Sequence, residues 1–326
     1  MALDEIRKTK IEKIKKLRKA GIESYPAVSE RTHSISEALL NFDDLSNSGK
    51  ETILAGRVMA KREHGGSVFF DINDGSGKIQ GLIKEDVVGK NEFNHFGEFI
   101  DRGDFVEVKG TLLKTKTGEK TLLAASYRLL SKALLPLPEK WHGLEDTEER
   151  LRKRYLDLVM HPEEKEIFIK KARFWQATRE FLMKEGGLEV ETPVLEQIPG
   201  GADAEPFKTH MNALDIDLYL RIAPELHLKR LIVAGFEKVF EIGKAFRNED
   251  IDAQHNPEYT LLELYWAYVD YNDIMTLTEN LIHDITLKIL GKEVIEYQGK
   301  TIDLRVPWRR LSFLDALKEY GNIDID

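Results

Sequence analysis

Hydrophobic and polar residues alternate along two neighbouring stretches of the chain, FEIGKAF at 240–246 and YTLLELYWAY at 259–268. A period of two is typical of strands with one buried face, so these stretches predict an antiparallel hairpin. The insert between them is polar and carries four candidate ligand-binding side chains, Arg247, Glu249, His255 and Asn256. A guanidinium and an imidazole on a rigid hairpin are suited to gripping a triphosphate, while an inert solvated loop explains this stretch equally well by itself.

Short strands separated by glycine-containing turns are predicted between residues 52 and 130. The expected strands are 52–61, 67–73, 78–84, 104–114 and 120–130, and the longer piece 85–101 should contain a helix. Five strands with a helix after the third are the layout of an OB-fold barrel, a fold that presents a strand face to oligonucleotides.

One face of this predicted barrel has an aromatic residue to spare. Alternation directs Val68 and Phe70 to one face of their strand and Phe69 to the other. An aromatic ring outside the core can stack on an unpaired base while polar groups read the edge of that base. The candidate nucleic-acid contacts on or beside this face are Arg62, Phe69, Gln80 and Glu119.

Helices and strands share the rest of the chain. The expected elements are a helix at 163–185, strands at 188–191 and 218–222, a helix that starts at Pro224, a helix at 273–290, a hairpin at 294–302 and a helix at 313–320. The fold class is therefore α+β, a five-stranded barrel followed by an antiparallel sheet flanked by helices. The expected domains are an N-terminal basic helix and connection at 1–48, the barrel at 49–135, a linker at 136–160 and a second domain at 161–326.

The first twenty residues are basic, although the whole chain has a net charge of −9. The overall acidity argues against a protein that coats nucleic acid non-specifically, but eight lysines and arginines within residues 1–20 leave room for a local basic surface. These residues predict an amphipathic helix whose charged face could lie along a phosphate backbone. A solvated helix that its apolar stripe fixes to the next domain would carry the same pattern.

The residue types exclude several kinds of chemistry. The absence of cysteine excludes disulfides and thiolate catalysis and is compatible with a reducing cytoplasm. The nine histidines lack the HxxxH and HExxH spacings of zinc sites. The sequence has no apolar run of about 18 residues and no signal-peptide core near its start, so we expect a cytoplasmic protein without a membrane partner.

Seven longer motifs point in one direction. They are TKTGE, HGLEDTEERLRKRYLDL, ETPVL, IPGGA, YLRIAPELHLKRLIVAGFEKVFEI, FRNED and HNPEYTLLELYWAYVDYND. Together they resemble the class II aminoacyl-tRNA synthetases of the lysyl type across essentially the whole chain. The resemblance implies that lysine and ATP form lysyl-adenylate and that lysine then passes to the 3′ end of tRNA(Lys), in protein translation.

The resemblance also implies an ATP site on the hairpin. Arg247 would be the catalytic residue, because it would hold the α-phosphate where charge develops as the lysine carboxylate attacks. Glu249 would meet the adenine amino group, Tyr259 would stack on the adenine ring, and His255 and Asn256 would grip the phosphates. Such sites position and neutralise their substrates, with Mg²⁺ bridging phosphate oxygens.

Lysine selection has a physical basis of its own, because an ammonium group out of water needs carboxylates. The resemblance places Glu225 and Glu263 in the lysine pocket, with Tyr265 beside them and Gly201 allowing the backbone to approach the amino acid. Glu263 is flanked by leucines in an alternating strand, so a buried carboxylate there should have a cationic partner. An aspartyl-tRNA synthetase would instead need a cationic residue for its substrate.

The implied partners are L-lysine, tRNA(Lys) through the barrel face, and a second copy of the chain. The homodimer would form through the region that begins at Ile167 and ends at Pro193. Local departures from the family pattern occur at three positions: Glu205 stands where arginine is expected, and Lys244 and Asp250 flank FRNE where arginine and glycine are typical.

A larger departure concerns the end of the sequence, which lacks the glycine-rich third signature of the class and its arginine. We therefore expect an N-terminal portion of a synthetase that is inactive alone, with the magnesium ligands beyond Asp326. Two alternatives stay open, an aspartyl- or asparaginyl-tRNA synthetase and a non-catalytic tRNA-binding protein. A stand-alone enzyme that modifies proteins is disfavoured, because such enzymes lack the anticodon-binding barrel.

Overall fold

The computed structural model describes residues 3–138, 144–252 and 254–325, which divide into two compact units at 1–164 and 165–326. Part of the predicted linker, residues 139–143, lies outside the described residues. No helix in the described part of the chain is both long enough and apolar enough to cross a membrane.

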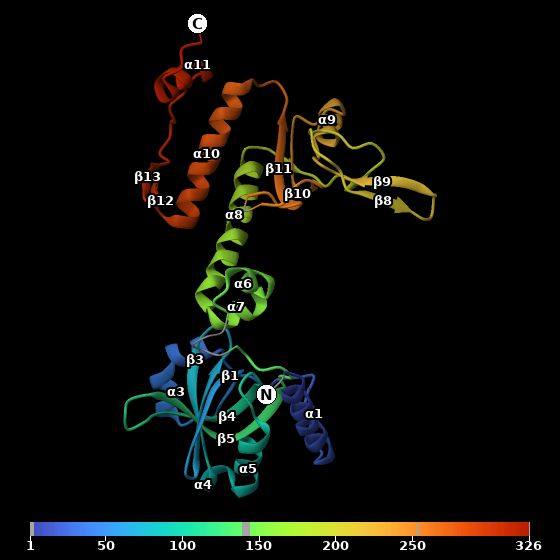
Figure 1. Ribbon diagram of the computed structural model, residues 1–326. Coiled ribbons are helices and arrows are strands. Elements are labelled where there is room, and N and C mark those ends of the chain that lie inside the picture. Colours follow the sequence, from blue (N-terminus) through green and yellow to red (C-terminus); the bar gives the residue numbers. More distant parts are fainter. Residues whose placement is uncertain (1–2, 139–143, 253, 326) are drawn as a thin grey trace. The chain divides into compact units, whose positions relative to one another are not determined.

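A closed five-stranded barrel forms the centre of the first unit (Figure 1). Its strands are β1 Thr52–His64, β2 Ser67–Asn73, β3 Lys78–Lys84, β4 Phe105–Lys114 and β5 Lys120–Ser131, and they follow the order β1-β2-β3-β5-β4 around the barrel. Helices α4 Glu85–Val88 and α5 Lys90–Phe99 lie between β3 and β4 in sequence. The predicted OB fold is confirmed.

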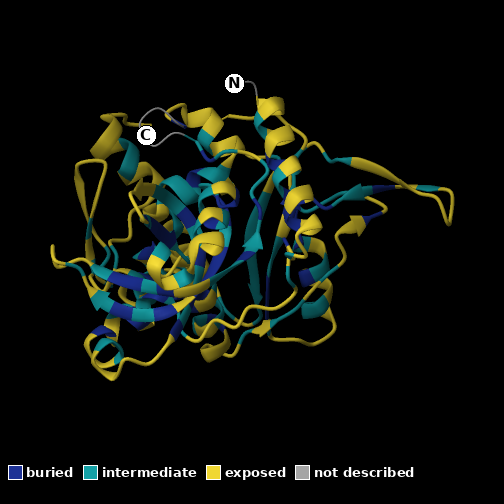
Figure 2. Cartoon of the chain, turned by 90° about the horizontal axis from the view of Figure 1, so that it is seen from below, coloured by how far each residue is buried: buried dark blue, intermediate teal, exposed yellow. Residues whose placement is uncertain are grey.

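The pairing of β1 with β4 closes the barrel. Its core forms because apolar side chains alternate along the strands and point inward. Val68 and Phe70 are buried, whereas Phe69 between them is only half-buried, as alternation predicts. Phe70 packs on Phe96 of α5, with ring centroids 4.9 Å apart, so the helix after β3 closes one part of the core. Figure 2 shows buried positions in dark blue that alternate with intermediate positions in teal along the strands.

Helix α1 (Leu3–Lys19) is fixed to the barrel by apolar packing and by ion pairs. Ile14 and Leu17 are buried, and Lys13 and Lys16 reach Asp101 and Glu98 at 2.7 and 3.0 Å. The structure agrees with the alternative in which the apolar stripe of this helix fixes it to the next domain, and two ion pairs add to that packing. Two further short helices follow, α2 Ile35–Leu40 and α3 Phe42–Ser48.

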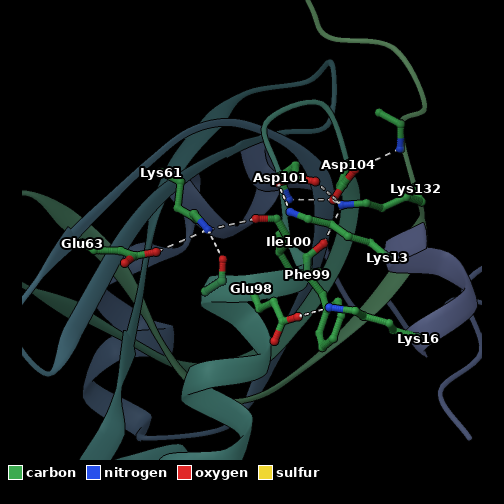
Figure 3. Close-up of polar contacts among 12 residues, drawn as sticks. Lys13, Lys16, Lys61, Glu63, Glu98, Phe99, Ile100, Asp101, Asp104 and Lys132 are labelled. Atoms are coloured by element: carbon green, nitrogen blue, oxygen red, sulfur yellow. Dashed lines mark hydrogen bonds and ion pairs between the residues drawn. The ribbon is translucent and has the colours of Figure 1, made fainter. Parts of the chain in front are cut away.

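Beneath α1 lies a buried ammonium group, the side chain of Lys132 (Figure 3). It donates to the carbonyl of Phe99 and to the carboxylates of Asp101 and Asp104, the last at 2.7 Å. Burial raises the pKa of Asp104, whereas hydrogen bonds from Lys13 and Lys132 outweigh burial at Asp101 and lower the pKa of that carboxyl. Lys13 of α1 and Lys132 after β5 thus share the carboxylate of Asp101, and Lys132 also pairs with Asp104.

The predicted linker contains two helices, α6 Thr147–Arg152 and α7 Arg154–Met160. Their centre is the buried carboxylate of Asp157, which accepts from Arg150 at 2.7 Å and from Arg154 at 2.5 Å, while the His161 ring lies 2.8 Å away. Much of the predicted linker is therefore helical, and ion pairs to Asp157 hold its two helices together. A 3-10 turn, Pro162–Glu164, leads to the second unit.

Among its described residues, the second unit contains three small sheets and two long helices (Figure 1). Its helices are α8 Lys165–Lys184, α9 Glu225–Val233, α10 Tyr271–Leu290 and α11 Phe313–Ala316, the last continued by a π-helical turn Leu317–Gly321. Its strands are β6 Leu188–Glu189, β7 Leu195–Glu196, β8 Lys208–Met211, β9 Ile216–Leu220, β10 Lys238–Phe246, β11 Glu258–Trp266, β12 Val294–Tyr297 and β13 Lys300–Asp303.

The predicted hairpin is the pair β10 and β11, which join antiparallel. The sheet order is β11-β10-β6, and β6 runs parallel to β10, so this sheet is mixed and not purely antiparallel as expected. One face of the hairpin carries Phe240, Leu262 and Leu264, which pack with residues of α8 and α10. The other face is left for the side chains that carry candidate chemistry.

Candidate substrate and nucleotide site

The four residues expected to hold lysine lie together in the second unit. Glu263 and Tyr265 share one face of β11, and Glu225 opens α9, which packs on the hairpin. The Tyr265 hydroxyl lies close to both carboxylates, and burial followed by the charge of Glu263 raises the pKa of Tyr265 to about 12. A Cβ built on Gly201 would lie 2.9 Å from the Cβ of Glu225, so glycine allows the chain to pass close to this carboxylate.

Glu263 carries a carboxylate that the protein leaves incompletely paired. Its Oε2 atom is buried and lacks a hydrogen-bond partner. Burial, and then the charge of Glu225, raise the pKa of this carboxyl above its ordinary value. No ion pair to Glu263 occurs within the described ranges, so the cationic partner expected for a buried carboxylate at this position is not supplied by the described residues. Lys229, one turn along α9, pairs with Glu225 instead, at 2.6 Å.

The buried guanidinium that the sequence analysis missed is Arg221, at the end of β9. It pairs with Glu241 of β10 at 2.5 Å, and both side chains are almost fully buried. Its remaining donors reach the carbonyl of Lys244 at 2.8 Å and the hydroxyl of Thr192 at 3.1 Å. The signal was available, because an arginine interrupts the apolar run LYLRIA, where a charged residue requires a buried partner.

The candidate nucleotide residues are only partly brought together. Arg247 follows β10 directly; its Nε atom is buried without a partner, and its guanidinium lies 5.5 Å from the ring centroid of Tyr259. Glu249 accepts a hydrogen bond from the backbone of Glu205 at 3.1 Å. His255 and Asn256 lie in the exposed turn, where the His255 ring is 2.7 Å from Asp252 and this contact lowers the pKa of Asp252 to about 2.

The three departures from the family pattern lie around this loop. Lys244 forms an exposed ion pair with Glu258 on the partner strand, at 2.7 Å. Glu205 contributes its backbone to the loop, donating to Glu249 and accepting from the amide of Asn248 at 2.7 Å. Asp250 is exposed. In the part of the chain that the structure describes, no group of three or more His, Asp or Glu residues could hold a metal ion.

The candidate nucleic-acid face lies on the barrel of the first unit. Arg62 of β1 is exposed directly opposite the half-buried Phe69 of β2. Gln80 of β3 accepts from the hydroxyl of Thr121 at 2.9 Å, and that hydroxyl also lies 3.1 Å from the carbonyl of the exposed Glu119. Two small groups of candidate residues result, Arg62 opposite the ring of Phe69, and the Gln80 amide linked through Thr121 to the backbone of Glu119.

The family described as "tRNA synthetases class II (D, K and N)" matches residues 146–326, and an OB-fold nucleic acid binding domain matches residues 52–130. The chain belongs to this class II synthetase family.

Curated relatives narrow the similarity further. The chain is 51% identical over 324 residues to a lysine–tRNA ligase of Clostridium botulinum, covering 99% of this chain and 64% of the relative. It is 50% identical over 322 residues to a lysine–tRNA ligase of Pelotomaculum thermopropionicum, with 99% and 63% covered. A third, from Carboxydothermus hydrogenoformans, is 51% identical, with 99% and 65% covered. The chain thus spans slightly less than two thirds of these relatives.

Proposed function

We propose that this chain carries the lysine-recognising and anticodon-binding parts of a lysine–tRNA ligase. The reaction is ATP-dependent activation of L-lysine to lysyl-adenylate, followed by transfer to tRNA(Lys). The observation that carries the proposal is Glu263, whose buried Oε2 lacks a partner beside a second acid, Glu225. A substrate ammonium placed there would satisfy both the charge and the missing hydrogen bond.

The chemistry on the ATP side is positioning and charge neutralisation. Arg247 holds the α-phosphate, and its buried, unpartnered Nε is a donor that an oxyanion would satisfy. The ring of Tyr259 stacks on adenine, and Glu249 accepts from its amino group. His255 and Asn256 hold the phosphates, which requires the exposed turn to close over ATP. Mg²⁺ enters with ATP, and no described residue is assigned to it.

The proposed tRNA contact is the barrel face. Phe69 stacks on an anticodon base, while Arg62 neutralises a phosphate and Gln80 and Glu119 read base edges.

A homodimer through residues 167–193 is supported by apolar side chains that the second unit leaves exposed on α8, including Ile167 and Phe168. We place the reaction in the cytoplasm, where a chain without cysteine meets no redox constraint.

The test is amino-acid selectivity, since the matched family includes synthetases denoted D, K and N. Calorimetric titration of the 326-residue chain with L-lysine, L-aspartate and L-asparagine should give heat only with lysine. Glu263→Gln should abolish that heat while leaving the thermal unfolding temperature nearly unchanged. Binding of aspartate or asparagine in place of lysine would reject the proposal in favour of the related specificity. Retention of tRNA binding without any amino-acid or ATP binding would identify a non-catalytic tRNA-binding protein.

A further inference from the structure

Two carboxylates face each other across the central hairpin, because Glu241 of β10 and Glu263 of β11 are directly opposed in the strand register. Side chains opposed in this way point to the same face of the sheet, and like charges at such positions are destabilising. A third acid, Glu225, adds to the negative charge that acts on Glu263. The face therefore gathers three carboxylates within one small region, and the distribution of the nearby cations decides which of them stays available.

One buried cation is available to this group, and Glu241 takes it. Arg221 donates to Glu241 Oε1 at 2.5 Å, and the hydroxyl of Thr192 donates to the other oxygen at 2.6 Å. Both oxygens of Glu241 are thus satisfied. Glu263, directly opposite, receives no hydrogen bond at Oε2. The charge of Arg221 lowers the pKa of Glu263, but burial and the charges of Glu225 and Glu241 outweigh this effect, so the pKa is raised.

The backbone is shaped to keep this pairing. A Cβ built on Gly243 would lie 2.2 Å from Nη2 of Arg221 and 3.0 Å from Oε1 of Glu241. Any side chain at this position would push the guanidinium out of its place, so the glycine is required by the ion pair and not by a turn. Arg221 is further held by the carbonyls of Lys244 and Thr192, at 2.8 and 3.3 Å. The guanidinium therefore has little freedom to swing toward Glu263.

We infer that Glu241 is a specificity-positioning residue, which occupies Arg221 so that the carboxylate of Glu263 stays free for the cationic group of the substrate. The inference rests on the proposed lysine pocket and adds the reason for its selectivity. The five charged groups Arg221, Lys229, Glu225, Glu241 and Glu263 sum to one net negative charge (two positive, three negative), which one bound ammonium balances.

Removing the charge of Glu241 tests this partition. In Glu241→Gln the guanidinium of Arg221 loses its counter-charge, and Glu263 becomes the acid that compensates it. The expected result is at least about tenfold weaker binding of L-lysine, equivalent to about 1.4 kcal/mol, with L-norleucine, which lacks the terminal ammonium group of lysine, little affected. The lysine-to-norleucine affinity ratio, measured by titration of the full chain, is a readout that a merely structural role would not move.

A double variant separates charge partition from misfolding. Arg221→Met combined with Glu241→Gln removes both buried charges, leaves Glu263 unpaired again and should restore the lysine preference. The matched control is Glu258→Gln, which removes an exposed acid of the neighbouring strand β11 and should leave the ratio unchanged. If Glu241→Gln alone does not fold, the double variant decides, because loss of lysine preference in a folded double variant overturns the inference.

The failure of this inference differs from the failure of the proposed function. A wild-type chain that binds neither lysine nor norleucine, or binds both equally, removes lysine as the substrate and this inference with it. A wild-type chain that prefers lysine, together with an unchanged preference in folded Glu241→Gln, overturns only the role of Glu241.

Discussion

The aromatic ring of Phe70 lies against Gly81, its cross-strand partner in the barrel, so closely that a Cβ built on Gly81 would be 2.2 Å from the ring. The ring fills the space that a side chain at position 81 would occupy. Since protein interiors are close-packed, neither residue can change size without moving the other. The ring of Phe70 and the absence of a side chain at Gly81 therefore fit each other in the barrel core, and even one added methyl group at position 81 should lower the stability.

We expect Gly81→Ala to destabilise the first unit by about 1–3 kcal/mol, because overpacking forces the ring or the strand to shift. Urea unfolding followed by far-ultraviolet circular dichroism measures the loss. Gly66→Ala is the matched control, since the nearest atom to a Cβ there is 3.8 Å away. Equal stability of the two variants would show that the ring moves aside at no cost.

Lys132 should contribute more to the stability of the first unit than the exposed ion pair that α1 makes through Lys16. Lys132→Ala leaves the carboxylates of Asp101 and Asp104 in a buried corner without their shared cation, which typically costs about 3–5 kcal/mol. Lys16→Ala removes an exposed ion pair with Glu98 and should cost less than about 1 kcal/mol. Thermal unfolding of the two variants and a proteolysis assay of the α1 region compare them, and similar losses would contradict this ranking.

Arg247→Lys keeps the positive charge but removes the planar donors. If Arg247 holds a phosphate of ATP, the affinity for ATP should fall at least about tenfold, which corresponds to a charge-assisted hydrogen bond of about 1.5–3 kcal/mol. Fluorescence or calorimetric titration with ATP measures this change. Lys244→Gln serves as the control, because it removes an exposed cation three residues before Arg247, and this variant should bind ATP normally. Equal affinities in all three proteins would remove Arg247 from the nucleotide site.

Lysine binding should depend on pH through Glu263. Burial and the neighbouring Glu225 raise the pKa of this carboxyl in the free protein, whereas a bound ammonium would lower it. The affinity is therefore full above the raised pKa and falls as the pH drops through it, by up to about tenfold for each pH unit. Calorimetric titrations from about pH 4 to pH 8 measure the slope. A slope that persists in Glu263→Gln would assign the titration to another group.

Phe69→Ala should weaken binding of an anticodon stem-loop by about 1–3 kcal/mol, the usual value of stacking one base on an aromatic ring. Phe69 is half-buried on the outer face, so the barrel should remain folded. Phe69→Tyr keeps the ring and should bind normally. Fluorescence anisotropy with a labelled RNA hairpin checks both variants, and unchanged binding by the alanine variant would exclude stacking at this position.

Alternation and motif spacing alone determined the barrel, the hairpin and the common face of Glu263 and Tyr265. These features depend on a strand period of two, which is a local property and can be read from consecutive residues. Phe69 between Val68 and Phe70 is the clearest example, because its place outside the core follows from its neighbours. The motifs that point to Arg247 and Glu225 are likewise contiguous in sequence.

The tertiary structure decided which charges meet. Arg221 and Glu241 are twenty residues apart, and the sequence analysis, which expected a cationic partner for a buried Glu263, did not identify Arg221 or its ion pair with Glu241. The same applies to Lys132 under α1 and to Asp157, whose partners turn an expected linker into packed helices. The physical reason is that a charge in a sequence has no fixed partner. Burial makes an unpaired charge costly, and only the folded chain determines which partner is within reach.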